Sequence, residues 1–159
     1  MLRPLSRPLS RLSIVQRRAS STTSLENLKA AFAGSAMNSR RYLYFAQRAD
    51  IEGRAEAAAL FRSVGEGETS HAMGHMEFLA EAHDPATEEP IGDTASNLRA
   101  ALASERREWI EMYPAYAKTA RDEGLDSVAE WFDMLAIAQR RHHDRFDAAL
   151  RELEDRPPR

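Results

Sequence analysis

Apolar residues recur at three- and four-residue spacing through four long stretches of the chain, as in helices that bury one face. These stretches cover roughly residues 25–50, 54–81, 93–122 and 125–153. Gly53 and Gly124 follow the first and third stretches, where glycine commonly ends a helix. The pattern therefore predicts an all-α protein with four helices.

The longest predicted connection, residues 83–92, separates the first two helices from the last two. It contains Pro85 and Pro90 and is long enough to cross over a bundle. At the other end, residues 156–159 read Arg-Pro-Pro-Arg and cannot continue a helix. We therefore expect one helical domain over residues 24–155, followed by a short tail over 156–159.

The two halves of the helical region resemble each other. Residues 27–35 (NLKAAFAGS) align with residues 97–105 (NLRAALASE) at an offset of 70. Further along, an offset of 71 relates Glu52 to Glu123, Gly53 to Gly124, Phe61 to Phe132, and His71 to His142. A helix pair duplicated once predicts a four-helix bundle with approximate two-fold symmetry.

Residues 1–23 differ in composition from the rest of the chain. They are rich in Arg and Ser, and the first acidic residue is Glu26. Arg3, Arg7 and Arg11 recur every four positions with leucines between them, which on a helix separates a basic face from an apolar one. This pattern is typical of a mitochondrial transit peptide that is removed, and it predicts the matrix as destination. A plastid address and a disordered basic arm are the alternatives.

Composition excludes several kinds of site. The chain has no cysteine, so disulfides and Cys-ligated zinc or iron–sulfur sites are ruled out. Its net charge is −3 although residues 1–18 hold five arginines and no acid, so the remainder is strongly acidic. An acidic surface argues against nucleic-acid binding. No apolar run approaches the roughly 18–20 residues of a membrane span.

Polar residues interrupt the apolar stripes at corresponding places. The inward positions are Glu68 and His71 on the second stretch, Glu105 and Glu108 on the third, and Gln139 and His142 on the fourth. Buried charges are costly unless they are paired or bind metal, so a shared cation is the simplest explanation. One Glu-x-x-His alone would be weak evidence, because a histidine on such a stripe is usually a hydrogen-bonded core residue. Glu-x-x-His in one half at the position of Gln-x-x-His in the other, together with two inward acids on the third stretch, indicates a metal site, present or ancestral.

Two features of the second stretch allow more than one interpretation. His75 lies one turn after His71 and is either a ligand or a core residue. Gly65, Gly67 and Gly74 lie inside a predicted helix, where each costs about 1 kcal/mol relative to alanine. Close helix approach, a local bulge or relaxed selection would each account for them.

The chain resembles the rubrerythrin family, in the form that lacks a rubredoxin domain, over roughly residues 25–150. The matching segments are Ala31-Phe32-Ala33-Gly34, Arg41-Tyr42-Leu43-Tyr44-Phe45-Ala46, Glu68-Thr69-Ser70-His71-Ala72, Glu105-Arg106-Arg107-Glu108-Trp109, Glu111-Met112-Tyr113-Pro114 and Arg141-His142. The resemblance implies a ferritin-like bundle with a non-haem di-iron centre. It also implies hydrogen peroxide as a substrate and a homodimer as the assembly.

The resemblance assigns metal ligands but leaves two positions changed. The matched ligands are Glu68, His71, Glu105, Glu108 and His142. Ser35 and Gln139 stand where the family has glutamates, the second of them a bridging ligand. Three carboxylates remain to offset the +4 charge of two divalent ions. The resemblance thus implies one iron ion or a weak second site, with manganese, zinc and no metal as alternatives.

Three functions are consistent with this sequence. The first is a mitochondrial metal-binding oxidoreductase acting on peroxide or oxygen, supplied by an external electron donor because the chain has no cysteine for a rubredoxin centre. The second is a structural or accessory subunit of a mitochondrial assembly with a degenerate metal site. The third, a ferritin-like hydroxylase of quinone biosynthesis, needs the full carboxylate set and is disfavoured by Ser35 and Gln139. The first is slightly favoured.

Overall fold

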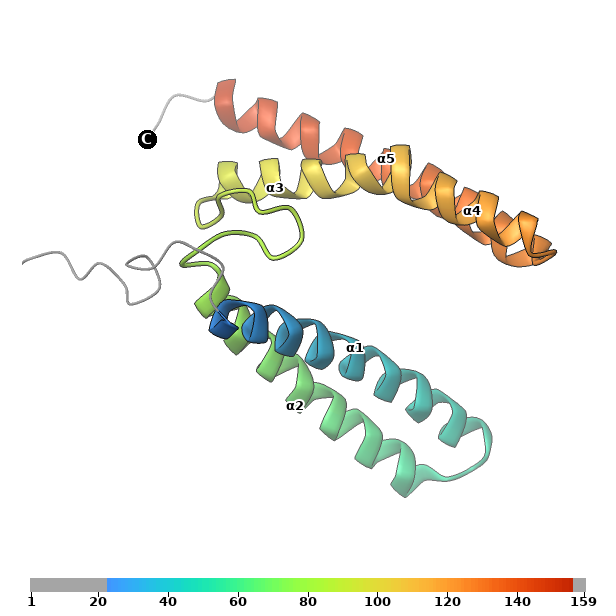
Figure 1. Cartoon of the computed structure of the whole chain (residues 1–159). Coiled ribbons are helices and arrows are strands. Elements are labelled where there is room, and N and C mark those ends of the chain that lie inside the picture. Colours follow the sequence, from blue (N-terminus) through green and yellow to red (C-terminus); the bar gives the residue numbers. More distant parts are fainter. Residues whose placement is uncertain (1–22, 156–159) are drawn as a thin grey trace, which may run out of the picture. The chain divides into compact units, whose positions relative to one another are not determined.

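The structure is a computed structural model that describes residues 23–155 (Figure 1). Its helices are α1 (Thr23–Ile51), α2 (Ala55–Leu79), α3 (Thr94–Arg107), the π-helix η2 (Glu108–Met112), α4 (Tyr113–Asp122) and α5 (Asp126–Asp155). Residues 23–155 contain helices, turns and loops without a strand, which confirms the all-α prediction. The predicted transit peptide, apart from Thr23 in α1, and the tail over 156–159 lie outside the described residues.

The chain divides into two compact units at residues 82 and 83. In the first unit α1 packs along α2, and in the second α3, η2 and α4 pack along α5. Each unit is therefore one antiparallel helix pair, as the internal repeat predicts. The third predicted helix is a continuous α3–η2–α4 run.

The glycine that follows the first helix of each pair has the same backbone conformation in both units. Gly53 has φ +71° and Gly124 has φ +74°, a left-handed conformation that costs glycine little. Arg54 N–H donates to Ala49 C=O at 2.8 Å, a bond that satisfies a carbonyl at the end of the helix. Leu125 N–H makes the matching 2.8 Å bond to Ala120 C=O. The two helix pairs thus turn by the same backbone motif.

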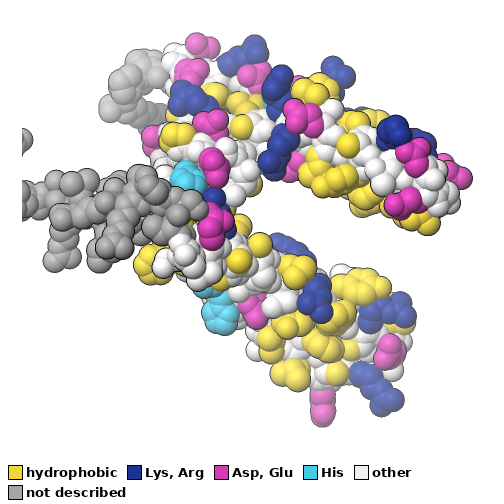
Figure 2. All heavy atoms as spheres, viewed as in Figure 1, with side chains coloured by type: hydrophobic (Ala, Val, Ile, Leu, Met, Phe, Trp, Pro, Cys, Tyr) yellow, Lys and Arg dark blue, Asp and Glu magenta, His cyan; other side chains and the backbone are white. Residues whose placement is uncertain are grey.

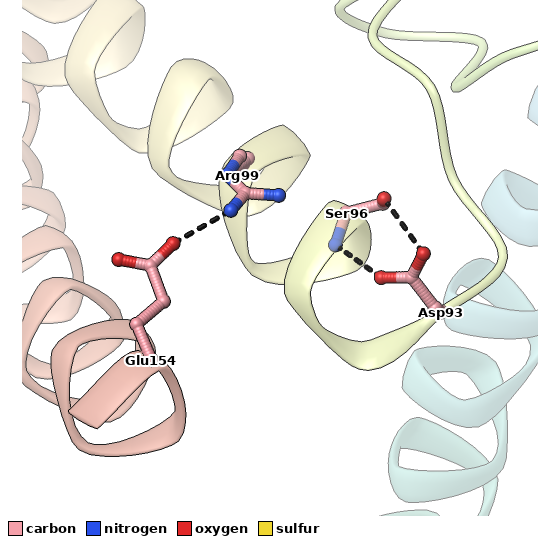
Figure 3. Close-up of polar contacts among 4 residues, drawn as sticks. All are labelled: Asp93, Ser96, Arg99 and Glu154. Carbon is pink, nitrogen blue, oxygen red and sulfur yellow. Dashed lines mark hydrogen bonds and ion pairs between the residues drawn. The ribbon is translucent and has the colours of Figure 1, made fainter. Parts of the chain in front are cut away.

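The connector and the start of α3 are held by aspartates. The Asp84 carboxylate accepts from the backbone N–H groups of Ala86 and Thr87, which closes a tight loop. Asp93 caps α3 by accepting from Ser96 N–H at 2.8 Å (Figure 3). The predicted helix start near residue 93 is confirmed.

Corresponding residues of the two units make corresponding contacts. Phe61 contacts Tyr42 and Phe45 with ring centroids 6.4 and 5.6 Å apart. The residues 71 positions later repeat this cluster: Phe132 lies against Tyr113 and Tyr116 at 6.0 and 5.5 Å. The duplication is therefore present in packing as well as in sequence.

An ion pair near each turn repeats with its charges exchanged. Arg62 on α2 pairs with Asp50 on α1. At the equivalent positions of the second unit, Asp133 on α5 pairs with Arg121 on α4. Each unit thus has an ion pair at this site, but the acidic and basic residues have exchanged positions. The ion pair is the repeated feature, and the charge at each position is not.

The π-helix explains why the repeat offset changes from 70 to 71. Residues up to 105 align with the first unit at an offset of 70, and residues from Tyr113 onward align at 71. The extra residue falls in η2, where a π-turn accommodates one more residue than an α-helix. The equivalent part of α1 is uninterrupted α-helix.

The seams within the two pairs are lined by small residues. The buried residues at these contacts are mainly alanines: Ala46, Ala49, Ala58 and Ala72 in the first unit, and Ala100, Ala117, Ala120 and Ala129 in the second. Gly65 also belongs here, because an added Cβ would lie 3.4 Å from the backbone oxygen of Ser39. That distance is an ordinary van der Waals contact, so an alanine would also fit at position 65, and no atom near Gly67 or Gly74 explains those glycines.

Several larger apolar residues lie outside these seams, although Leu79 is fully buried. Leu60 is 63% exposed and Trp131, its repeat counterpart, is 53% exposed within the described structure. Figure 2 shows hydrophobic side chains at the surface of both units. Leu60 and Val64, which lie one turn apart on α2, are thus not on the face that joins α1 to α2. Among residues 23–155, no helix has both the length and the apolarity to cross a membrane.

Candidate metal centre

In the first unit the predicted ligands Glu68 and His71 lie one turn apart on α2. His71 Nδ1 is 3.5 Å from Glu68 Oε2, so the two side chains form a polar pair. Glu68 also hydrogen-bonds to Ser35 and Asn38 of α1. The Glu68 carboxylate therefore joins the two helices of its pair.

These contacts favour the ionised form of Glu68. Hydrogen bonding to Ser35 is the largest influence and holds the pKa of Glu68 below its ordinary value of 4.5. Partial burial opposes this shift, and the neighbouring His71 and Asn38 reinforce it. The family resemblance places a metal ligand at position 35. Ser35, which stands there instead, thus hydrogen-bonds to the retained acid Glu68.

In the second unit Glu108 is held from two sides. Gln139 Nε2 donates to Glu108 Oε2 at 2.5 Å, which joins α5 to η2. Ser104 Oγ, one turn earlier on α3, donates to Glu108 Oε1 at 3.2 Å. Both carboxylate oxygens of Glu108 therefore have a donor from within the same unit.

Glu105 is in a different situation from Glu108. Its Oε2 atom is buried and has no hydrogen-bond partner among the described residues, and it lies 3.6 Å from His142 Nδ1. Burial raises the pKa of Glu105 above 4.5, and the neighbouring Glu108 carboxylate adds to the rise while His142 opposes it. An ionised Glu105 would therefore be stabilised by a nearby cation.

The two candidate histidines are the more accessible members of their pairs. The His71 side chain is 67% exposed and that of His142 is 48% exposed, against 20% for Glu68 and 17% for Glu105. His75 is half-buried, and its role as ligand or core residue stays open.

Each unit brings some of the predicted ligands together. Glu68 lies with His71 in the first unit, and Glu105 lies near Glu108 and His142 in the second. Across residues 23–155, no three His, Asp or Glu side chains converge closely enough to form a metal-binding group. The five-residue ligand set thus stays a prediction.

Sequence reasoning missed three residues near these acids. Asn38 and Ser104 hydrogen-bond to Glu68 and Glu108, and Tyr113 is close enough that both Glu108 and Glu105 influence it. Burial, followed by these carboxylates, raises the pKa of Tyr113 above 10.0. The repeat could have identified Asn38, because it lies at the position of Glu108 at an offset of 70.

Known proteins resemble this chain over most of its length. The family model described as Rubrerythrin matches residues 26–150. The chain is also 36% identical to rubrerythrin-1 of Clostridium acetobutylicum, with 84% of this chain and 73% of that protein covered. The chain belongs to the rubrerythrin family. Rubrerythrin of Porphyromonas gingivalis is 39% identical, covering 82% of this chain and 67% of that protein.

Membership in the rubrerythrin family sets the class of fold and of chemistry. It confirms a ferritin-like helical protein, and the family binds iron at a di-iron site and consists typically of oxidoreductases of peroxide or oxygen. A solved structure, "Fully reduced state of nigerythrin (all ferrous)", is 26% identical with a TM-score of 0.40, covering 97% of this chain and 79% of that one.

The residues present fit one cation better than two. Glu105 offers a buried carboxylate oxygen that lacks a hydrogen-bond partner, beside an imidazole. Carboxylate oxygens and imidazole nitrogens are a donor set that iron accepts. The first unit offers one candidate carboxylate, Glu68, and the second offers two, since Ser35 and Gln139 are neutral. Two divalent ions bring four positive charges, so the donor set of either unit by itself does not fit a full di-iron centre.

Proposed function

We propose that this protein is a mitochondrial member of the rubrerythrin family that holds one iron ion and acts on peroxide or oxygen. The proposed ligands are Glu68, His71, Glu105, Glu108 and His142. The observation that carries the proposal is the buried oxygen of Glu105, which accepts no hydrogen bond and lies 3.6 Å from His142, because burying a carboxylate is costly unless it is paired. An iron ion bound there would offset that charge.

Iron would supply the electron-transfer chemistry, and the chain's own residues would control access and charge. One iron provides one electron at a time, so reduction of a peroxide by two electrons needs an external donor for the second. Tyr113 lies near Glu105 and Glu108, and its phenol, like that of an ordinary tyrosine, is protonated at neutral pH and would be available to donate a hydrogen bond to a substrate oxygen there.

We also propose where the protein acts and with which partners. The basic, acid-free leader favours import into the mitochondrial matrix. A homodimer is proposed because rubrerythrins are commonly homodimers. The external electron donor would then be a matrix protein or small reductant.

A structural or accessory subunit of a mitochondrial assembly is the second candidate. It is favoured by one observation: both oxygens of Glu108 are already hydrogen-bonded to Ser104 and Gln139. A carboxylate satisfied in this way does not need a cation.

Peroxide consumption by anaerobically iron-loaded protein, supplied with a chemical reductant, distinguishes the two candidates. The proposal predicts turnover that falls strongly in Glu105→Ala, with Glu66→Ala on the exposed surface of α2 as the matched control. The paired change Ser35→Glu and Gln139→Glu should raise iron uptake by restoring two carboxylates. No iron-dependent turnover in the wild type would favour the accessory role.

A further inference from the structure

Both changed ligand positions now carry hydrogen-bond donors directed at a retained acid. Gln139 Nε2 donates to Glu108 across the α5–η2 contact at 2.5 Å. Ser35 hydrogen-bonds to Glu68 across the α1–α2 contact. A glutamate in place of either residue would instead set two negative charges side by side. The two substitutions are therefore complementary to the acids that remain.

Two further donors complete this arrangement. Ser104 Oγ donates to the second oxygen of Glu108 at 3.2 Å, and the Asn38 side chain hydrogen-bonds to Glu68. Asn38 occupies the repeat position of Glu108. In the first unit the acid, Glu68, lies on the second helix of the pair, and its donors lie on the first helix, α1. In the second unit the acid, Glu108, lies on the first run of the pair, in η2, and the donor Gln139 lies on the second helix, α5. The same cross-helix pairing is thus built twice with the roles exchanged.

We propose that four side chains hold Glu68 and Glu108 in place in the metal-free protein and compete with metal ions for these carboxylates, and so determine how the site binds metal. They are Ser35 and Asn38 at Glu68, and Ser104 and Gln139 at Glu108. A carboxylate has about four lone-pair sites, and donors from Gln139 and Ser104 occupy one on each oxygen of Glu108. A cation at Glu108 must share the carboxylate with these N–H and O–H groups, whose partial positive charge opposes it. These donors stabilise the helix pairs without metal and weaken metal binding at the same time.

The competition gives Gln139 an effect that a merely structural residue or a metal ligand would not have. Gln139→Met keeps a similar length and removes both the donor and the carbonyl oxygen. If the amide competes with metal, its loss destabilises the metal-free protein and strengthens metal binding. If the amide oxygen is a ligand, its loss weakens metal binding. The inference rests on the proposed function only in taking ferrous iron as the competing ion.

The test compares full-length wild type, Gln139→Met and the control Gln47→Met, an exposed glutamine on α1. Anaerobic calorimetric titration with ferrous iron measures affinity, and thermal unfolding without metal measures stability. We expect Gln139→Met to bind iron roughly tenfold more tightly, since the amide donor no longer competes with the cation for the Glu108 carboxylate. Its metal-free Tm should fall below that of Gln47→Met.

Unchanged or weaker iron binding by Gln139→Met would overturn the competition. If that variant does not fold, Ser104→Ala removes only the bond to Glu108 Oε1 and should show a smaller gain in affinity; weaker binding there would equally overturn it. Iron binding by Gln139→Met but not by wild type would support the competition and reject the proposed function. Iron binding by wild type without a gain in affinity in the variants would support the proposed function and reject the competition.

Discussion

Glu105 is the residue where burial and charge oppose each other most directly. It is an acid with a 17% exposed side chain and an oxygen without a hydrogen-bond partner. Glu108, one turn away on the same run of helix, has both oxygens satisfied. Two neighbouring glutamates of the same predicted role are thus held in opposite ways. This difference decides which of them has more to gain from a cation.

Replacing Glu105 by glutamine should stabilise the metal-free protein at neutral pH. Because burial raises its pKa, folding favours the protonated acid, and the cost of ionisation appears as pH rises above 4.5. Glu105→Gln removes that cost, and we expect the free energy of unfolding to rise by about 1 kcal/mol. Chemical denaturation at pH 7 measures it, with Glu66→Gln as an exposed control. A loss of stability, or an equal gain at pH 3, would show that the charge of Glu105 is not the cause.

The bond between Ser35 and Glu68 should contribute stability in the opposite pH range. The pKa of Glu68 is lowered, so its contribution is present above pH 4.5 and is lost as pH falls through the folded value. Ser35→Ala should therefore lower the Tm at pH 7 and have a smaller effect near pH 2. Thermal unfolding across this range, with Ser63→Ala on the exposed face of α2 for comparison, measures the difference. An effect of Ser35→Ala that does not change with pH would contradict this role.

At the scale of elements, the π-helix is the main difference between the two helix pairs. The aromatic contacts of Tyr42 with Phe61 and of Tyr113 with Phe132 match, although one more residue lies before Tyr113. The extra residue is accommodated locally in η2, so the contacts on both sides of it keep their register. Helices were predictable from long apolar periodicity, but a single added residue shows in the sequence only as a changed repeat offset.

Deleting Ile110 from η2 should be tolerated better than deleting Arg40 from α1. The first deletion removes the extra residue, so that a single offset would relate the whole run to the uninterrupted α-helix of the other unit. The second has no bulge to absorb it and rotates Tyr42 and Phe45 away from Phe61 by about 100°. We expect a cooperative unfolding transition near the wild-type Tm for the first variant and a large loss of Tm for the second. Equal losses would contradict the interpretation of η2 as an accommodated insertion.

At the scale of the whole molecule, the duplication was readable from sequence because many paired positions keep their residue type, at an offset of 70 before η2 and of 71 after it. The helix boundaries, the glycine turns and the Asp93 cap followed from local rules of backbone and capping. The seams did not, because alanines line them while the larger apolar residues Leu60 and Trp131 lie outside. Periodicity identifies an apolar face but does not tell which partner covers it.

The sequence predicts candidate residues for the site, but it does not predict their contacts. Glu-x-x-His and its counterpart Gln-x-x-His marked the acids and imidazoles, and the family match covers all of them. That Gln139 and Ser35 donate to retained acids depends on side-chain geometry across a helix pair, which spacing along one helix does not contain. The proposed single-iron centre follows from combining both kinds of information.

Iron stoichiometry tests this account most directly. Purified protein lacking residues 1–22 is loaded with ferrous iron under anaerobic conditions, freed of excess metal, and analysed for bound iron per chain. We predict about one iron per chain, reduced strongly in Glu105→Ala and unchanged in Glu66→Ala. Two irons per chain in the wild type would contradict the effect assigned to Ser35 and Gln139, and no bound iron would contradict the proposed metal centre.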